Sequence, residues 1–165
     1  MEKQSRRSLL KGAVKAAAVV TTGSIAAEKI SAQATGKLEK RSPLPVTPES
    51  VAPQTGAKPL FSSVVAYGKL LFLAGVGAHF KGTIQEQTTW VLDQLEKTLT
   101  DSGSSLQKVL KVSVFLNDIK DFDGMNSVYS QRNWGSLPPA RTTVSPAGGL
   151  PGEGALVEID MVACI

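Results

Sequence analysis

Cysteine and histidine each occur only once in this chain of 165 residues, and each scarcity excludes a kind of site. Cys164 has no second cysteine with which to form a disulfide within the chain. His79 alone gives zinc or iron too few of the nitrogen and sulfur ligands that these metals favour. Apolar residues are plentiful instead: they make up 42% of the sequence, enough for the core of one ordinary domain.

The part of the chain after residue 34 has no excess of either charge. Residues 1–34 contain six basic and two acidic side chains, whereas the other 131 residues contain twelve of each. Nucleic-acid binding draws most of its affinity from basic side chains that neutralise phosphates. The balanced charge after residue 34 therefore counts against a nucleic-acid partner, although the whole chain has a formal net charge of +4.

Residues 1–34 are typical of a targeting segment. The pair Arg6-Arg7 precedes a mild apolar stretch from Gly12 to about Ala27, and Ala32-Gln33-Ala34 offers a small-x-small cleavage site. The segment resembles a twin-arginine (Tat) signal peptide, which implies contact with the Tat translocase and a periplasmic or exported location. The alternative is an uncleaved amphipathic or membrane-anchoring helix, but the apolar stretch is shorter than the roughly 20 residues that span a bilayer.

Residues 35–57 are predicted to form an extended arm. Four prolines lie in it among serine, threonine and glycine, and this spacing forbids a helix. We therefore expect the folded domain to occupy residues 58–165.

Hydrophobic periodicity in the domain predicts five strands and two helices. Residues such as Ile84, Val91 and Leu95 fall at helical spacing, with Gln87 assigned to the opposite, polar face. In chain order the predicted elements are strands over Phe61–Ala66 and Lys69–Gly77, a helix between Gly82 and Gly103, a strand over Leu110–Leu116, a helix from Phe122 to Tyr129, and strands over Ala140–Val144 and Leu156–Cys164.

The order β-β-α-β-α-β-β predicts an α+β sandwich, in which one mixed sheet carries both helices on a single face. The other face of the sheet stays bare unless it packs against something. Because several strands are apolar on both faces, a chain of this size is expected to oligomerise.

Three charged residues in two apolar strands are candidates for chemistry. Arg141 lies in the otherwise uncharged run Pro138–Val144, where a guanidinium could hold a carboxylate through two parallel hydrogen bonds. Glu158 and Asp160 share one face of the last strand, where a carboxylate could take a proton from water. The alternatives are an edge-strand arginine that reaches solvent and two solvated carboxylates.

Taken together and in this order, these segments resemble a known family. The motifs are Tyr67–Gly75, Gly82-Thr83-Ile84 with Gln87-Thr88, Val109–Ile119 with Asp121-Phe122, Asn126–Tyr129, Pro139–Thr142, Leu150-Pro151 and Val157-Glu158-Ile159. From Phe61 to the C-terminus the chain resembles the RidA (YjgF-type) family of reactive-intermediate deaminases.

The resemblance implies a RidA-like, chorismate mutase-like fold and a homotrimer with clefts between subunits. It also implies hydrolysis of 2-imino and enamino acids, such as 2-iminopropanoate and 2-iminobutanoate, to 2-keto acids and ammonia without a cofactor or metal. Through the matching motifs, the resemblance implies that Arg141 binds the substrate carboxylate and that Glu158 positions or deprotonates the attacking water. Thr143 and Asn126 are implied to help seat the substrate.

The chain departs from the family pattern around the expected cleft. Phe61 replaces a tyrosine, Ala74-Gly75-Val76 replaces Ser-Gly-Gln, and Thr143 replaces a frequent cysteine. We therefore expect a more apolar cleft, with Phe61, Ala74 and Gly75 in its wall, that suits a larger or less polar imino acid. The loss of polar anchors leaves open a non-catalytic module that binds small carboxylates. A ribonuclease is a third interpretation, against which the balanced charge counts.

Overall fold

A six-stranded mixed sheet organises the part of the chain that the computed structural model describes, residues 38–44 and 60–165. All neighbouring strands run antiparallel except β4 and β5, which are parallel. In spatial order the strands are β1 (Lys40–Arg41), β2 (Val64–Tyr67), β3 (Leu70–Gly77), β6 (Val157–Cys164), β4 (Val109–Leu116) and β5 (Ala140–Val144).

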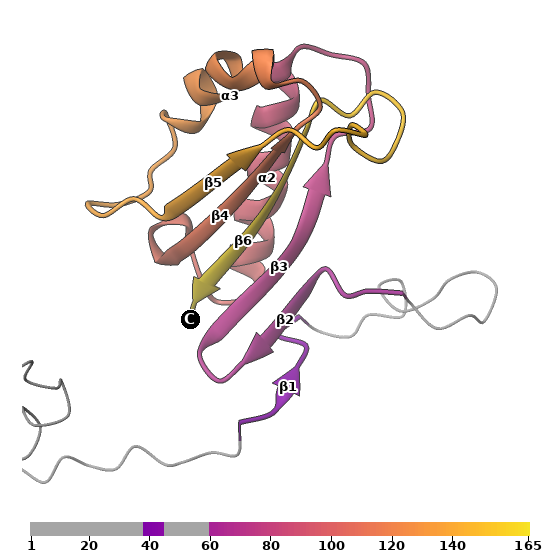
Figure 1. Ribbon diagram of the computed structural model, residues 1–165. Helices are drawn as coiled ribbons and strands as arrows, with labels where there is room; N and C mark the ends of the chain where they lie inside the picture. Colours follow the sequence, from indigo (N-terminus) through magenta and orange to yellow (C-terminus); the bar gives the residue numbers. More distant parts are fainter. Residues whose placement is uncertain (1–37, 45–59) are drawn as a thin grey trace, which may run out of the picture. The chain divides into compact units, whose positions relative to one another are not determined.

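Two helices accompany the sheet. Figure 1 shows α2 (Ile84–Asp101) crossing behind the strands, with α3 (Phe122–Tyr129) above β5 in that view. Short 3-10 turns at Leu106–Lys108 and Ile119–Asp121 lead into β4 and α3. The predicted order β-β-α-β-α-β-β and the α+β class are confirmed, with β1 as an additional edge strand. Within the described residues, no helix combines the length and apolar character that a bilayer crossing needs.

The sheet begins earlier in the chain than the sequence predicts. β1 lies within the segment assigned to an arm, yet it pairs with β2 through Lys40 opposite Tyr67 and Arg41 opposite Ala66. A strand of two residues is too short to have a hydrophobic period, so the sequence gives no sign of it. The remainder of that segment, 35–37 and 45–57, and the targeting segment 1–34 lie outside the described residues.

A capping box starts α2. The Thr83 hydroxyl accepts a hydrogen bond from the backbone of Glu86 at 3.2 Å, and the Glu86 carboxylate accepts one from the Thr83 backbone at 2.7 Å. These hydrogen bonds stabilise the charged form and hold the pKa of Glu86 below its ordinary value.

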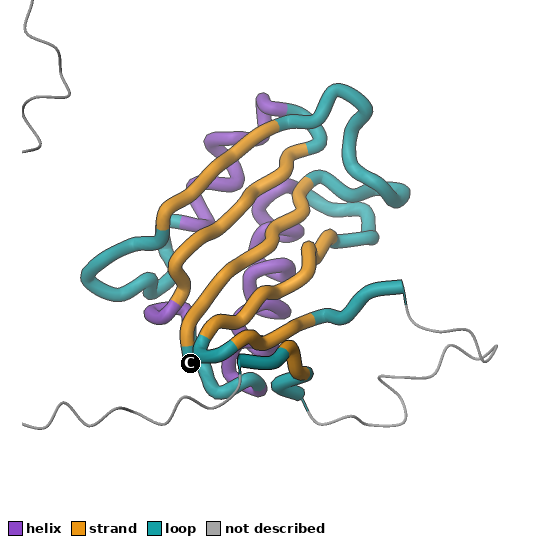
Figure 2. Tube along the Cα trace, turned by 60° about the horizontal axis from the view of Figure 1, so that its bottom comes forward, coloured by secondary structure: helices purple, strands orange, loops and turns teal. Residues whose placement is uncertain are grey.

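One face of the sheet forms the core and the other is bare in the single chain. The helix-facing side chains of β3, β4 and β6 are buried, among them Leu71, Leu73, Val112, Val114, Ile159 and Met161. The opposite face exposes large apolar side chains, among them Phe72 at 44% and Leu110 at 49%. Figure 2 shows the helices gathered on one side of the strands. Apolar exposure on this scale is typical of a face that packs against another molecule.

Candidate functional site

Arg141 lies on the edge strand β5 and faces the helices. Its register partner is Val112, which in turn pairs with the buried Met161 on β6. The guanidinium carbon lies 4.6 Å from the ring centroid of Tyr129 and 5.8 Å from that of Phe122. Among the described residues, Arg141 forms no ion pair with a carboxylate. Aromatic rings therefore hold a guanidinium whose hydrogen-bond donors remain available to an anion.

The ring of Tyr129 packs against Trp134 as well as against Arg141. Its ring stacks on Trp134 with a centroid distance of 4.5 Å, and the Trp134 indole N–H donates to the Tyr129 carbonyl at 2.9 Å. The phenol is nearly buried, and this burial raises the pKa of Tyr129 while the charge of Arg141 acts in the opposite direction.

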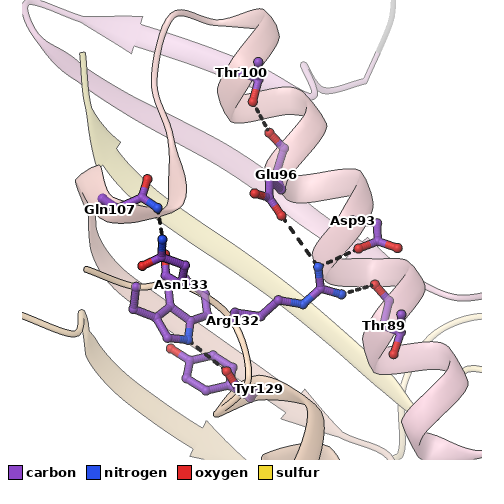
Figure 3. Close-up of polar contacts among 9 residues, drawn as sticks. Thr89, Asp93, Glu96, Thr100, Gln107, Tyr129, Arg132 and Asn133 are labelled. Atoms are coloured by element: carbon purple, nitrogen blue, oxygen red, sulfur yellow. Dashed lines mark hydrogen bonds and ion pairs between the residues drawn. The ribbon is translucent and has the colours of Figure 1, made fainter. Parts of the chain in front are cut away.

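Arg132, in the segment after α3, binds three residues of α2, as Figure 3 shows. One guanidinium nitrogen lies 2.6 Å from a carboxylate oxygen of Asp93 and 3.6 Å from one of Glu96, and the other donates to the Thr89 carbonyl at 3.0 Å. The Arg132 side chain is only 18% exposed. Arg132 lies between Tyr129 and Trp134 in the chain, so these contacts tie the segment that carries both rings to α2. The Tyr129 ring in turn contacts the guanidinium of Arg141.

Two predicted substrate-binding residues, Thr143 on β5 and Asn126 on α3, belong to the same elements as Arg141 and its aromatic neighbour Tyr129. Thr143 shares the face of Arg141, and its hydroxyl is buried without a hydrogen-bond partner among the described residues. Such an atom normally finds a partner in a ligand, a water or a neighbouring chain. Asn126 is half-buried on α3, one turn before Tyr129. Phe61 precedes β2 and is 76% exposed in the single chain.

Glu158 projects from the other face of the sheet. Its register partners are Phe115 on β4 and Gly77 on β3, and its side chain is half-buried. The pairing of β3 with β6 shifts between Leu73 and Val76, so a bulge containing Ala74 and Gly75 lies beside it.

The carboxylate of Glu158 occupies the space that a side chain at position 75 would take. A Cβ added at Gly75 would overlap Glu158 Oε1, because the carboxylate lies directly against the Gly75 backbone. The predicted site residues Gly75 and Glu158 are thus brought together, with Ala74 next to them.

A cavity of about 240 Å³ opens beside Glu158. Its other lining residues are mostly apolar or backbone: Phe115, Pro146, Gly149, Leu150 and Pro151. The Asn117 side chain fixes this loop by accepting a hydrogen bond from the Leu150 backbone at 3.1 Å. Glu158 itself has no hydrogen-bond partner or ion pair within the described residues, so its carboxylate is free to bind water.

A larger, more open hollow of about 580 Å³ lies against Phe80 and Trp90 on the outside of α2. The two carboxylates in its wall are already engaged, Glu86 by the helix cap and Asp93 by Arg132. It contains neither Arg141 nor Glu158. Elsewhere in the described ranges, no three His, Cys, Asp or Glu side chains are grouped so that they could hold a metal ion. The two predicted site residues, Arg141 and Glu158, occupy separate positions on the sheet and do not line this hollow.

A single chain does not bring Arg141 and Glu158 together. Arg141 is in register with Val112, whereas Glu158 is in register with Phe115, and these two neighbours on β4 point to opposite faces. The predicted site residues therefore form two separate groups in one chain, Arg141 with Thr143 and Glu158 with Gly75.

Gln87 is fully buried, so its predicted place on the polar face of α2 is wrong. Its amide bonds to the Phe80 carbonyl, the Gly154 carbonyl and the Leu156 backbone N–H at 2.7, 2.7 and 2.8 Å. The polar side chain is satisfied inside because three backbone groups converge on it. Gln87 lies three residues after Ile84 and four before Val91, and this helical spacing could have placed it on the buried face of α2.

Comparison with known proteins gives consistent results. The sequence model of the family described as endoribonuclease L-PSP matches residues 51–165. The chain is 42% identical over 113 residues to the mitochondrial protein mmf2 of Schizosaccharomyces pombe, covering 62% of this chain and 86% of that protein. It is 35% identical over 124 residues to a RutC family protein of Pyrococcus abyssi, covering 70% and 95%.

Solved structures agree with the fold. The crystal structure of a YjgF family member from Neisseria meningitidis superposes with a TM-score of 0.61 at 32% identity, over 66% of this chain and 90% of that one. The crystal structure of yeast Mmf1 gives a TM-score of 0.61 at 28% identity, over 73% and 96%.

Proposed function

The chain belongs to the endoribonuclease L-PSP family, which includes the YjgF and RutC proteins, and from this we propose that it hydrolyses 2-imino or enamino acids to 2-keto acids and ammonia. The observation that carries the proposal is the pair of uncompensated charges. Arg141 lies on aromatic rings without a carboxylate partner, and Glu158 lies beside an apolar cavity without a cation, among the described residues.

The proposed roles follow from the chemistry of an iminium carbon. Arg141 binds the substrate carboxylate through two parallel hydrogen bonds and so orients the neighbouring C=N group. Glu158 accepts a proton from water while the water oxygen bonds to the carbon and the C=N electron pair moves to nitrogen. The nitrogen then gains a proton, the C–N bond breaks with its electrons going to ammonia, and the hydroxyl becomes the keto oxygen. General acid–base catalysis of this kind contributes typically about 10²–10⁴ in rate.

We further propose that the site forms between copies in a homotrimer. Arg141 is on the edge strand β5, where a neighbouring chain can approach, and the bare apolar face that contains Phe72 also carries Glu158. If the β5 edge of one chain packs against the bare face of a neighbouring chain, the Arg141 of the first chain comes close to the Glu158 of the second.

The proposed substrates are imino acids with a small or medium apolar side chain, of which 2-iminopropanoate and 2-iminobutanoate are the simplest. The cavity beside Glu158 is lined mainly by proline, leucine, glycine and Phe115. Its volume of about 240 Å³ leaves room for a side chain longer than ethyl.

An amino-acid oxidase that generates imines in the cuvette tests the proposal. Semicarbazide captures the imine that has not been hydrolysed, so an active protein lowers the rate of semicarbazone formation. We expect wild type and the exposed control variant Lys120→Ala to lower it equally, and Arg141→Ala to lose the effect. Equal rates for wild type and Arg141→Ala would refute the proposal.

The alternative is a non-catalytic module of the same fold that binds small carboxylates through Arg141. It would show a melting temperature that rises with added 2-oxobutanoate but no release of ammonia. We propose no nucleic-acid partner, in spite of the family's description, because the residues after 34 carry balanced charge. A salt-sensitive gel shift with RNA would overturn that part.

We propose that residues 1–34 export the chain to the periplasm or beyond through the Tat translocase. The support is the Arg6-Arg7 pair followed by an apolar stretch and a small-x-small sequence. Two relatives carry mitochondrial names, which describe those proteins alone. Cell fractionation of the wild type against a variant with both arginines replaced by lysine tests the proposal: retention of only the variant supports it, and identical distribution contradicts it.

A further inference from the structure

The only histidine of the chain lies beside Glu158. His79 follows β3 by two residues, and a methyl group added at Gly77 would lie 3.8 Å from His79 Nε2 and 3.8 Å from Glu158 Oε2. The imidazole and the carboxylate therefore approach the same side of Gly77, and these two atoms are separated by no more than twice that distance. No hydrogen bond or ion pair joins them within the described chain. Any separation up to this limit is short enough for one water molecule or one substrate group to bridge.

His79 is exposed in the single chain, and the loop before β6 lies against one side of its ring. Gly152 has φ +92°, and a Cβ there would lie 2.5 Å from His79 Nδ1, so the loop before β6 closes directly over the ring. Ala78, the preceding residue, is fully buried.

The buried amide of Gln87 joins the two segments that carry this pair. It donates to the carbonyl of Phe80, the residue after His79, and to the carbonyl of Gly154, and it accepts from the backbone of Leu156, which leads into β6 and Glu158. A buried side chain with all its hydrogen bonds made is a rigid link. Gln87 therefore holds together the backbone segments from which the His79 and Glu158 side chains project.

We propose that His79 is a second catalytic acid–base residue, which delivers the proton to the substrate nitrogen while Glu158 takes the proton from water. The inference rests on the proposed imine hydrolysis. Imidazole is the side chain best suited to both donate and accept protons near neutral pH. In the mechanism above, the nitrogen must be protonated before the C–N bond breaks, and a second acid allows this while Glu158 still holds the proton that it took from water.

The proton and electron balance is as follows. Water adds to the iminium carbon, Glu158 accepts one proton, and the C=N electron pair becomes a lone pair on nitrogen. The imidazolium of His79 protonates that nitrogen, and the C–N bond breaks with its electrons leaving on ammonia. The hydroxyl proton returns to His79 as the C=O bond forms, and Glu158 releases its proton to ammonia. Iminium and water thus give keto acid and ammonium, and both side chains regain their starting states.

His79→Ala in the full chain, with Lys81→Ala as control on the same loop, provides the kinetic test. We expect His79→Ala to lower kcat about 10- to 100-fold with KM changed less than about twofold, because Arg141 still binds the carboxylate. Added imidazole should restore the rate of His79→Ala in proportion to its concentration, since the space between Gly77 and Gly152 is then vacant. Glu158→Gln should not respond to imidazole. An unchanged kcat, or a loss that imidazole does not restore, would overturn the inference.

Chemical modification of wild type provides a measurement that needs no variant to fold and no turnover. Diethyl pyrocarbonate acylates histidine, and His79 is the sole histidine, so the absorbance of N-carbethoxyhistidine reports this residue alone. We expect 2-oxobutanoate to slow the reaction at least threefold. Unaltered modification at saturating 2-oxobutanoate would contradict the placement of His79 at the site. If the wild type lowers imine levels no more than Arg141→Ala does, the proposed function fails, whereas an active wild type matched by His79→Ala removes only the role of His79.

Discussion

Arg141 and Glu158 project from opposite faces of one sheet, because their register partners Val112 and Phe115 are separated by an odd number of positions along β4. A guanidinium and a carboxylate so placed cannot act on one small molecule within a single chain. We propose that a second copy packs through the bare apolar face on the Glu158 side and through β5, the edge strand of the described sheet, on the Arg141 side.

Assembly is expected to depend on the bare face of the sheet. Phe72→Asp places a charge where another chain is proposed to pack, and burying an unpaired carboxylate is costly, so the variant should sediment as a monomer. Leu137→Asp is the matched control, because Leu137 is exposed outside the sheet. Analytical ultracentrifugation of both variants and wild type gives the answer. A Phe72→Asp protein that assembles like wild type would show that this face is not the interface.

Gly75→Ala is expected to displace the carboxylate of Glu158 without unfolding the domain. The added Cβ overlaps Glu158 Oε1, and the half-buried side chain must turn away, which should lower kcat at least tenfold. Gly148→Ala is the control, since a Cβ there meets nothing within 4 Å. Imine hydrolysis and the melting temperature are measured for each. Full activity in Gly75→Ala would mean that the position of Glu158 does not matter to the reaction.

Tyr129 is expected to ionise at higher pH than a free tyrosine, because burial of the phenol raises its pKa. The charge of Arg141 lowers the pKa of Tyr129, so Arg141→Met should raise it further. Because the pKa of the folded state is the higher one, the stabilisation is complete below the ordinary tyrosine pKa and is lost as pH rises toward the raised value. Ultraviolet titration of both proteins, each also carrying Tyr67→Phe so that Tyr129 alone reports, checks this. A lower pKa of Tyr129 in Arg141→Met would contradict the placement of the Arg141 guanidinium over the Tyr129 ring.

Arg132→Ala is expected to lower the free energy of unfolding by about 1–2 kcal/mol, because the mostly buried guanidinium loses two charged partners and the Thr89 carbonyl. Lys97→Ala removes an exposed ion pair with Asp101 and should cost less than about 0.5 kcal/mol. Urea unfolding of the two variants provides the comparison. If both cost the same, the Arg132 network is not the anchor of the segment after α3.

Most of the fold could be predicted from the sequence because its elements carry clear periods. The alternation Val112, Val114 and Leu116 and the helical spacing of α2 each report a buried face directly. β1 could not be predicted, since two residues have no period and their pairing depends on the edge of β2.

The site was less accessible to sequence reasoning. The charged residues Arg141 and Glu158 stand out in apolar strands, but the face each one occupies depends on the pairing of β4 with both neighbours, which no single segment encodes. The role of Gln87 depends on three backbone groups brought together by tertiary structure. The approach of His79 and Glu158 to the same side of Gly77 depends on the pairing of β3 with β6, which the sequence alone does not give.

Mixed assemblies test the central claim most directly. Arg141→Ala and Glu158→Gln are each expected to be inactive in imine hydrolysis, and the two proteins are then unfolded together in equal amounts and refolded. If each site takes Arg141 from one chain and Glu158 from its neighbour, random mixing restores about one quarter of the wild-type activity. If activity does not return although mixed assemblies form, Arg141 and Glu158 do not cooperate across a subunit interface, and the account is contradicted.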